Sequence, residues 1–271
     1  MNNRRVPIVP PVTLQRSVPI LMYHEVARRA PAGFEKFVVS PVAFARQMRW
    51  LAWRGYTAIG LDLLLDAREG RAALPVRPVV VTFDDGFQEC VDHAAPVLKA
   101  YGFRAIFYLV TGFMGATSRW LRPILGFELP IMSWSSARAL LDAGFDCGAH
   151  TVSHPHLTLL STDACRGELA ASRAELEAEL GRAVRHLAYP FGSYDAAVRA
   201  CAEEAGYRSA CSVRIGLSAV GDDRLALHRV PVSGTDSFTD FVWRLRTAHT
   251  VAESVRSGWR RLRGKTPTDD G

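Results

Sequence analysis

Residues 78–86 read Pro-Val-Val-Val-Thr-Phe-Asp-Asp-Gly, and this stretch decides the fold class. Its first part is dominated by β-branched residues, which is typical of a strand buried on both faces of a parallel sheet. Asp84 and Asp85 follow at once, and Gly86 permits the chain to turn there. The stretch therefore predicts a central strand with two carboxylates at its carboxyl end.

Alternating strands and helices extend from this stretch in both directions. A short strand is expected to begin at Pro19 and to end before His24, and Ser40-Pro41 marks the start of a helix that Gly55 stops. Toward the C-terminus the pattern predicts strands at 103–110, 145–149, 185–189, 208–213 and 225–232, with helices at 133–141 and 161–181. In a chain of 271 residues, this alternation predicts an α/β fold and favours a closed or nearly closed barrel over an open sheet.

The composition is that of a globular protein and says little about partners. Hydrophobic residues make up 48% of the chain and charged residues 22%, so a sizeable core can form. The net charge of +6 would suit an anionic partner, but the basic residues are spread along the chain without interleaved aromatics, and we expect no nucleic-acid partner. The five cysteines include no CxxC pair and are expected to be reduced and buried.

Polar residues that a core would exclude follow four of the predicted strands. They are His24, the pair Asp84-Asp85, the pair His150 and His154, and the turn Pro190-Phe191-Gly192. A barrel carries its active site at this end of its strands. The two histidines are four residues apart, so on a helical turn both imidazoles would face one side and could bind one metal ion. Two histidines with one carboxylate leave positions open for water and substrate, as in a catalytic metal site.

Two of these segments resemble motifs of a known family, the polysaccharide deacetylases with the NodB homology domain, also called carbohydrate esterase family 4. Residues 82–86 are similar to its first motif and residues 150–155 to its second, in the family's order. The resemblance implies a distorted (β/α) barrel and hydrolysis of the N-acetyl group of an amino sugar, with release of acetate. It also implies the site residues: Asp84 as general base, with Asp85, His150 and His154 holding one divalent metal ion. Zinc is the first choice for that ion, and Co²⁺, Ni²⁺ and Fe²⁺ suit the same ligands.

The third motif of the family matches only in part. Tyr189-Pro190-Phe191-Gly192 is similar to it, but the arginine that the family has two residues before the proline is Ala188 here. The arginine that supports the base in the family is therefore missing from this position. In the family the backbone N–H after the proline helps to hold the oxyanion, which implies a role for the Phe191 N–H. We accordingly expect Tyr189, Pro190 and Phe191 to lie at the substrate.

The general acid is expected near the N-terminus. The segment from Pro19 to His24 resembles that of the subgroup that de-N-acetylates poly-β-1,6-N-acetylglucosamine, in which the acid histidine comes first in the chain. The absence of the arginine at Ala188 is similar to that subgroup as well. The alternative acid is His228, at the family's usual C-terminal position, although the residues around it match poorly.

Two other functions remain open at this point. One is a hydrolase of a small-molecule amide or an O-acetyl ester on the same scaffold. The other is a carbohydrate-binding protein without turnover, which the presence of Asp84 argues against because binding needs no base. The expected partner is an N-acetylated glycan.

The chain is expected to contain three segments. Residues 1–18 would form a flexible arm, residues 19–235 the deacetylase catalytic domain, and residues 236–271 a basic amphipathic helix and tail. The helix from Phe238 to Leu262 would pack on the barrel wall or attach to a membrane surface. The sequence shows neither a signal peptide nor a membrane span, which predicts a cytoplasmic protein that could still touch a membrane peripherally.

Overall fold

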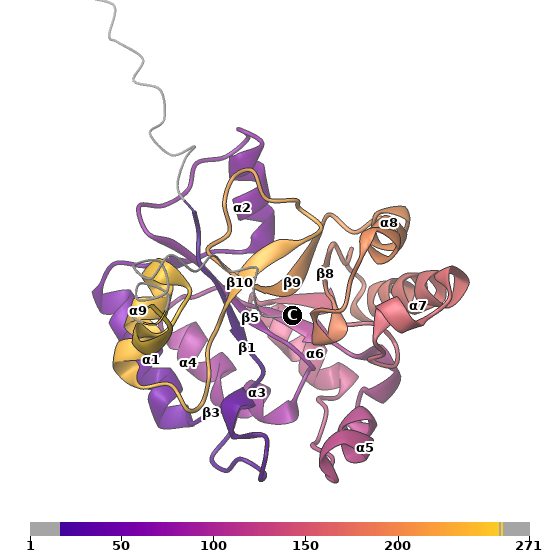
Figure 1. The fold of residues 1–271 in the computed structure, drawn as a ribbon, viewed down its shortest axis with the longest axis horizontal. Helices are drawn as coiled ribbons and strands as arrows, with labels where there is room; N and C mark the ends of the chain where they lie inside the picture. The colour runs from indigo at the N-terminus through magenta and orange to yellow at the C-terminus, as the bar shows by residue number, and fades with distance from the viewer. Residues whose placement is uncertain (1–16, 255, 257–271) are drawn as a thin grey trace, which may run out of the picture.

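A computed structural model describes residues 17–254 and residue 256 (Figure 1). Within them, seven parallel strands close into a ring, because β1 (Ile20–Tyr23) pairs with both β5 (Pro78–Phe83) and β10 (Leu227–Pro231). The remaining strands of the ring are β6 (Ile106–Leu109), β7 (Asp146–Ala149), β8 (His186–Ala188) and β9 (Ser209–Ile215). The ring is irregular between β9 and β10, where the register shifts. The predicted distorted (β/α) barrel is confirmed.

Three further short strands lie outside this ring. Strand β4 (Thr57–Ala58) extends the sheet beyond β5, and β2 (Glu25–Val26) pairs with β3 (Val38–Val39). Helices cover the outside of the ring (Figure 1). They are α1 (Pro41–Trp53), α2 (Leu61–Arg68), α3 (Gln88–His93), α4 (Ala95–Ala100), α5 (Arg122–Leu125), α6 (Trp134–Asp142), α7 (Thr162–Leu180), α8 (Ala196–Glu204) and α9 (Phe238–Thr247).

The helix starts expected from the sequence are present. The side chains of Ser40, Ser133 and Ser161 each accept a hydrogen bond from a backbone N–H of the first turn of α1, α6 and α7. Such caps satisfy donors that a helix cannot satisfy internally. Helices α2 and α8 were not predicted. All five cysteines are free and buried, as expected.

The alternation of side chains along β5 lets this strand serve both the core and the site. Val81 and Phe83 pack in the large hydrophobic cluster between the ring and the helices, where the Phe83 ring stacks on Phe107 with 4.7 Å between centroids. Val80 points the other way, into the smaller cluster that fills the ring. Because side chains alternate, Asp84 continues the inward series just beyond the end of the strand.

The two ends of the described chain differ from the expected segments. Residues 1–16, most of the predicted arm, and residues 257–271 lie outside the described residues. Val18, however, is fully buried and pairs with Ser218, so ordered structure begins before Pro19. Of the segment 236–271, Phe241 and Leu245 on α9 pack in the core.

The prediction of one continuous C-terminal helix is wrong, because the helix is interrupted. Helix α9 ends at Thr247, its C-cap Ala248 has a left-handed backbone (φ 63°), and helical structure resumes at Val251. Arg244, one of the basic residues of this amphipathic segment, is buried and paired with Asp236 at 2.8 Å. The described part of this segment therefore packs on the barrel wall through apolar side chains and through the buried, charged Arg244.

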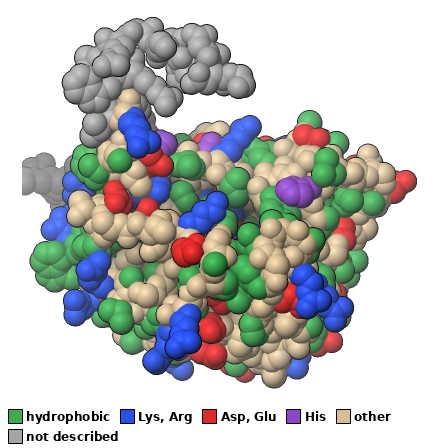
Figure 2. All heavy atoms as spheres, turned by 60° about the horizontal axis from the view of Figure 1, so that its bottom comes forward, with side chains coloured by type: hydrophobic (Ala, Val, Ile, Leu, Met, Phe, Trp, Pro, Cys, Tyr) green, Lys and Arg blue, Asp and Glu red, His purple; other side chains and the backbone are tan. Residues whose placement is uncertain are grey.

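Two features of the exterior bear on partners. Within the described residues, no helix is long and apolar enough to cross a membrane. On the face that Figure 2 presents, basic and acidic side chains are interspersed and do not form one broad patch of a single sign.

Candidate active site

The polar residues expected at the strand ends meet at the carboxyl end of the ring. Asp84 and Asp85 follow β5, and Asp85 itself adopts a left-handed backbone (φ 73°) before Gly86. This turn sends the two neighbouring carboxylates in different directions, one toward β10 and the other toward two histidines. The turn expected from Gly86 thus begins one residue earlier, at an aspartate, which tolerates such a backbone better than most residues.

Asp85, His150 and His154 bring three possible metal ligands together. The Nε2 atoms of both histidines lie 3.2 Å from Oδ1 of Asp85, and all three residues are buried. In a tetrahedral site with bonds of about 2.0–2.2 Å, two ligand atoms are separated by roughly 3.3–3.6 Å, so this spacing fits one ion. The Nδ1 of His150 lies 2.7 Å from the Ala188 carbonyl oxygen, which leaves its Nε2 free to bind. The three residues therefore fit a divalent metal ion.

The two histidines meet for a different reason from the one expected. Residues 150–156 form a loop and not a helical turn, with left-handed backbones at Thr151 (φ 67°) and His154 (φ 58°). Glu168 of α7 holds this loop, because its Oε2 accepts hydrogen bonds from the backbone N–H groups of Val152 (2.8 Å) and Ser153 (3.0 Å). The two imidazoles therefore meet because Glu168 holds the loop in this conformation, and not because of helical spacing.

An aromatic wall surrounds His154. The buried ring of Trp120 stacks on its imidazole with 4.7 Å between centroids, and Phe191 meets it edge-on at 4.6 Å. Burial lowers the pKa of His154 despite the opposing effect of Asp85, which favours the neutral form that binds metals. Trp120 lies outside the three motifs, so its position beside His154 could not be predicted from the sequence.

Asp84 is paired with an arginine that the sequence analysis missed. Arg229 of β10 is fully buried, and its two terminal nitrogens donate to the two oxygens of Asp84 at 2.7 Å each. Burial would raise the pKa of Asp84, but the guanidinium outweighs it and holds this pKa below its ordinary value. The arginine missing at position 188 is thus supplied from another strand, which corrects the expectation that the base lacks such support.

The same pair predicts how an Arg229→Met variant behaves. We expect its free energy of unfolding at neutral pH to fall by about 3–5 kcal/mol, because a buried carboxylate loses its partner. Burial then raises the pKa of Asp84 against only the weaker opposing effects of His150 and His24, so the acidic limb of the pH–rate profile should move to higher pH. Urea unfolding and acetate release across pH measure the two effects. A lower stability with an unmoved acidic limb would limit Arg229 to a structural role.

The two candidate acids lie in different environments. His24 follows β1, is half-buried, and is near enough to Asp85 and Asp84 for both carboxylates to act on its pKa. Burial lowers that pKa, and the two carboxylates raise it in part. His228 precedes the inward-facing Arg229 on β10, so it points to the other side of the strand, where its Nδ1 lies 3.0 Å from Asp222. The structure therefore brings His24, and not His228, to the carboxylates.

The turn after β8 buries two of the three side chains that were expected at the substrate. The side chain of Tyr189 is fully buried and its hydroxyl donates to the Leu225 carbonyl at 2.9 Å, which leaves it unavailable to a substrate. Pro190 is buried as well. Phe191 has a left-handed backbone (φ 56°), is 40% exposed, and stacks on His156 with 4.0 Å between centroids. Of the three residues expected at the substrate, Phe191 alone presents its side chain to the surface.

Comparison with known proteins identifies the family to which the chain belongs. The family described as polysaccharide deacetylase matches residues 71–210, which is more than half of the chain. This protein therefore belongs to the polysaccharide deacetylase family. The prediction that it is a hydrolase of this family, acting on amides, is confirmed.

Relatives of known structure and function extend the comparison. The deacetylase PplD of Streptococcus pyogenes has the same fold, with a TM-score of 0.74, 23% identity, and coverage of 87% of this chain and 99% of that one. A polysaccharide deacetylase of Bacillus cereus gives a TM-score of 0.73 and 25% identity over 87% of this chain and 71% of that one. The poly-β-1,6-N-acetyl-D-glucosamine N-deacetylase of Escherichia coli (strain K12) is 34% identical over 76 residues, 28% of this chain and 11% of that protein.

Proposed function

We propose that this protein is a metal-dependent hydrolase that removes the N-acetyl group of an amino sugar within a polysaccharide. The observation that carries the proposal is the adjacency of two carboxylates with different partners. Asp84 is held by an arginine and kept ionised, while Asp85 faces two imidazoles. A binding protein would need neither an ionised base nor an open set of metal ligands next to it.

Asp85, His150 and His154 are the proposed metal ligands. A divalent ion held by them would supply Lewis acidity toward the acetyl carbonyl and would lower the pKa of water in the site. Two imidazoles and one carboxylate suit zinc best, and cobalt, nickel and iron accept the same set.

Asp84 is the proposed general base. Its carboxylate, which Arg229 keeps deprotonated at neutral pH, takes the proton of the water that attacks the acetyl carbon. The N–H of Phe191 is proposed to donate to the oxyanion that forms on the carbonyl oxygen, because this residue follows β8 at the same end of the ring and its ring contacts His154 at 4.6 Å. The buried Tyr189 and Pro190 then support this turn and do not contact the substrate.

His24 is the proposed general acid. An amine leaves poorly as an anion, so the sugar nitrogen must receive a proton before its bond to the acetyl carbon breaks. The lowered pKa of His24 makes its imidazolium a stronger acid for that transfer. The products are acetate and a free amino sugar.

His24→Ala tests this assignment by the type of bond cleaved. We expect amide cleavage to fall by roughly two orders of magnitude or more, since a lost general acid typically costs that much. Cleavage of an activated aryl acetate should fall far less, because its leaving group departs without a proton. His228→Ala is the matched control and should change neither rate much. Equal losses of both rates in His24→Ala, or a selective loss of amide cleavage in His228→Ala, would remove His24 from this role.

A β-1,6-linked polymer of N-acetylglucosamine is the proposed substrate. The placement of His24 at the first strand and the similarity to the E. coli enzyme over 76 residues support this choice. Release of acetate and free amine should be measured on β-1,6-linked oligomers, on chitooligosaccharides and on small N-acetyl amides. Turnover of only the small amides would favour a small-molecule hydrolase, and binding of oligomers without acetate release would indicate a binding protein.

A further inference from the structure

The outward face of α1 is unusual for a solvated helix. Val42, Arg46, Arg49 and Trp53 recur at spacings of three or four and therefore share one face. Val42 is 81% exposed and Trp53 is 74% exposed. The opposite face of the helix packs in the core, and the thirteen residues of α1 include no acidic side chain. This helix thus presents apolar and cationic groups to the exterior.

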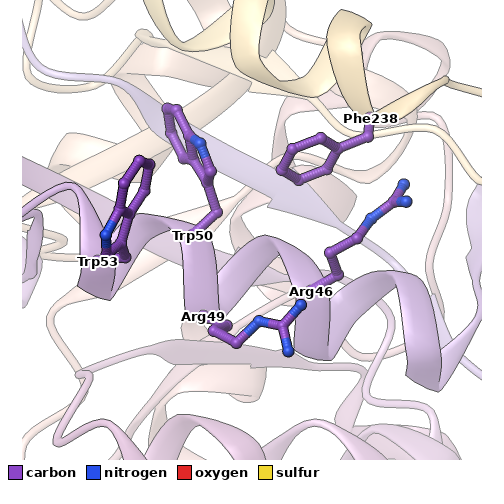
Figure 3. Close-up of a pocket in the computed structure, with 5 residues that line it drawn as sticks. All are labelled: Arg46, Arg49, Trp50, Trp53 and Phe238. Carbon is purple, nitrogen blue, oxygen red and sulfur yellow. The ribbon is translucent and has the colours of Figure 1, made fainter.

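A hollow of about 390 Å³ opens along this face (Figure 3). Trp50 and Trp53 stand together on one side of it, and Phe238 reaches in from α9. Arg46 and Arg49 lie below, with the Arg46 guanidinium 4.4 Å from the centre of the Phe238 ring. The hollow therefore combines aromatic faces with two guanidinium groups.

A second hollow of about 270 Å³ shares Trp50 with the first and continues this surface toward the amino ends of the strands. Arg54, Arg77 and Arg246 contribute cationic side chains to its lining. Val76, at its rim, is 79% exposed. We use the name α1 surface for the two hollows together with the outward face of α1, which carries Val42, Arg46, Arg49 and Trp53.

The cations of the α1 surface lack acidic partners. Within the described residues, Arg46, Arg49 and Arg54 form no ion pair with a carboxylate, and the Arg54 guanidinium lies over the Trp53 ring at 5.5 Å. Elsewhere, exposed arginines such as Arg138 and Arg166 are paired with glutamates. An uncompensated group of cations with exposed tryptophan and valine calls for an acidic partner that also accepts apolar side chains.

The terminal segments of the chain do not have this chemistry. Residues 1–16 include three arginines and no acidic residue, and residues 257–271 include three arginines and one lysine against two aspartates, so both segments are net positive. Like charge therefore disfavours either segment as the occupant. The net positive charge of both segments would instead add to the attraction of the chain for an acidic partner.

We propose that the α1 surface docks on an anionic phospholipid bilayer. Tryptophan and the stems of arginine prefer the interface between lipid headgroups and acyl chains, and arginine attracts anionic headgroups. An acidic glycan would use the aromatic faces and the guanidinium groups, but it would leave the projecting Val42 and Val76 in water. The active site lies at the carboxyl ends of the strands, whereas the second hollow is lined by Ser17, Pro19 and Pro78 at their amino ends. Docking through this surface would leave the active site facing the glycan.

Vesicle binding by the full chain tests the proposal. Co-sedimentation is compared between vesicles of pure phosphatidylcholine and vesicles with phosphatidylglycerol. We expect binding only to the anionic vesicles and its loss at high salt. The Arg46→Glu, Arg49→Glu double variant should bind roughly 25-fold more weakly or worse, on the order of fivefold for each lost cation. Trp53→Ala should also weaken binding, and because Trp53 is exposed this change removes no core contact.

The matched control is the Lys99→Glu, Arg182→Glu double variant, which makes the same change in net charge at exposed positions outside the α1 surface. It should lose far less binding. Deacetylation of a soluble oligomer should be unchanged in all these variants, which separates this proposal from the proposed function. Equal loss of binding in the control, unchanged binding in both α1 variants, or retention on a soluble polyuronate with none on anionic vesicles would overturn the proposal.

Discussion

Replacing both His150 and His154 by alanine is expected to abolish tight binding of a divalent ion and to reduce deacetylation to background. The two imidazoles supply two of the three ligand atoms that converge in the site, and a lone carboxylate holds a transition metal weakly. Metal content measured by elemental analysis of the purified variant gives a readout that does not depend on activity.

His156→Ala is the control for this experiment. His156 lies two residues beyond His154 in the same loop, but it stacks on Phe191 and is not among the converging ligands. This variant should retain its metal ion. The double variant should also remain folded, because its smaller side chains leave the hydrogen bonds of Glu168 to the loop intact. A normal metal content in the double variant would place the ion elsewhere.

Asp84→Asn is expected to lower the rate of deacetylation by roughly two orders of magnitude or more while the metal ion is retained. The change keeps the shape of the side chain but removes the base, whose contribution is typically of this size. It also leaves the buried Arg229 without a charged partner, so we expect a loss of about 3–5 kcal/mol in the free energy of unfolding.

A second substitution separates these two effects. The double variant Asp84→Asn, Arg229→Met removes both charges and should recover part of the lost stability without recovering activity. Rates, metal content and urea unfolding of the single and double variants distinguish the loss of the base from the loss of stability. Near-normal turnover by Asp84→Asn would show that another group acts as the base.

The effect of pH on the stability of this pair has a definite sign. The pKa of Asp84 is lower in the folded protein than in the unfolded chain. Its contribution to stability is therefore complete above about pH 4, the unfolded value, and is lost as the pH falls toward the folded pKa. Arg229 is charged throughout this range.

Local patterns in the sequence were sufficient for the barrel and for most of the site. The β-branched run of β5 and the serine caps act within a few residues of the chain, so they could be interpreted without the fold. The residues of the first two motifs also lie at strand ends, as expected. Roles of individual residues remain predictions for the experiments above.

Contacts between distant parts of the chain could not be predicted in the same way. Arg229 and Asp84 are 145 residues apart, and on β10 nothing distinguishes an inward arginine from an exposed one until the ring closes. The loop at His150 depends on Glu168 in helix α7, and the C-cap of α9 at Ala248 accompanies the pairing of the buried Arg244 with Asp236. Each of these differences arises from a tertiary interaction that overrides a local preference.

The position of β1 between β5 and β10 sets the stage of synthesis at which the residues of the site can come together. Both carboxylates and both histidines of the site are synthesised by residue 154, but the partner of Asp84 arrives only with residue 229. His24, made first, reaches the site when β1 takes its place between an early strand and the last one. A chain that stops before β10 would therefore carry every proposed reacting side chain and still leave its base without the arginine. The ring, and with it the arginine that pairs with Asp84, would thus be complete only after β10 has been made.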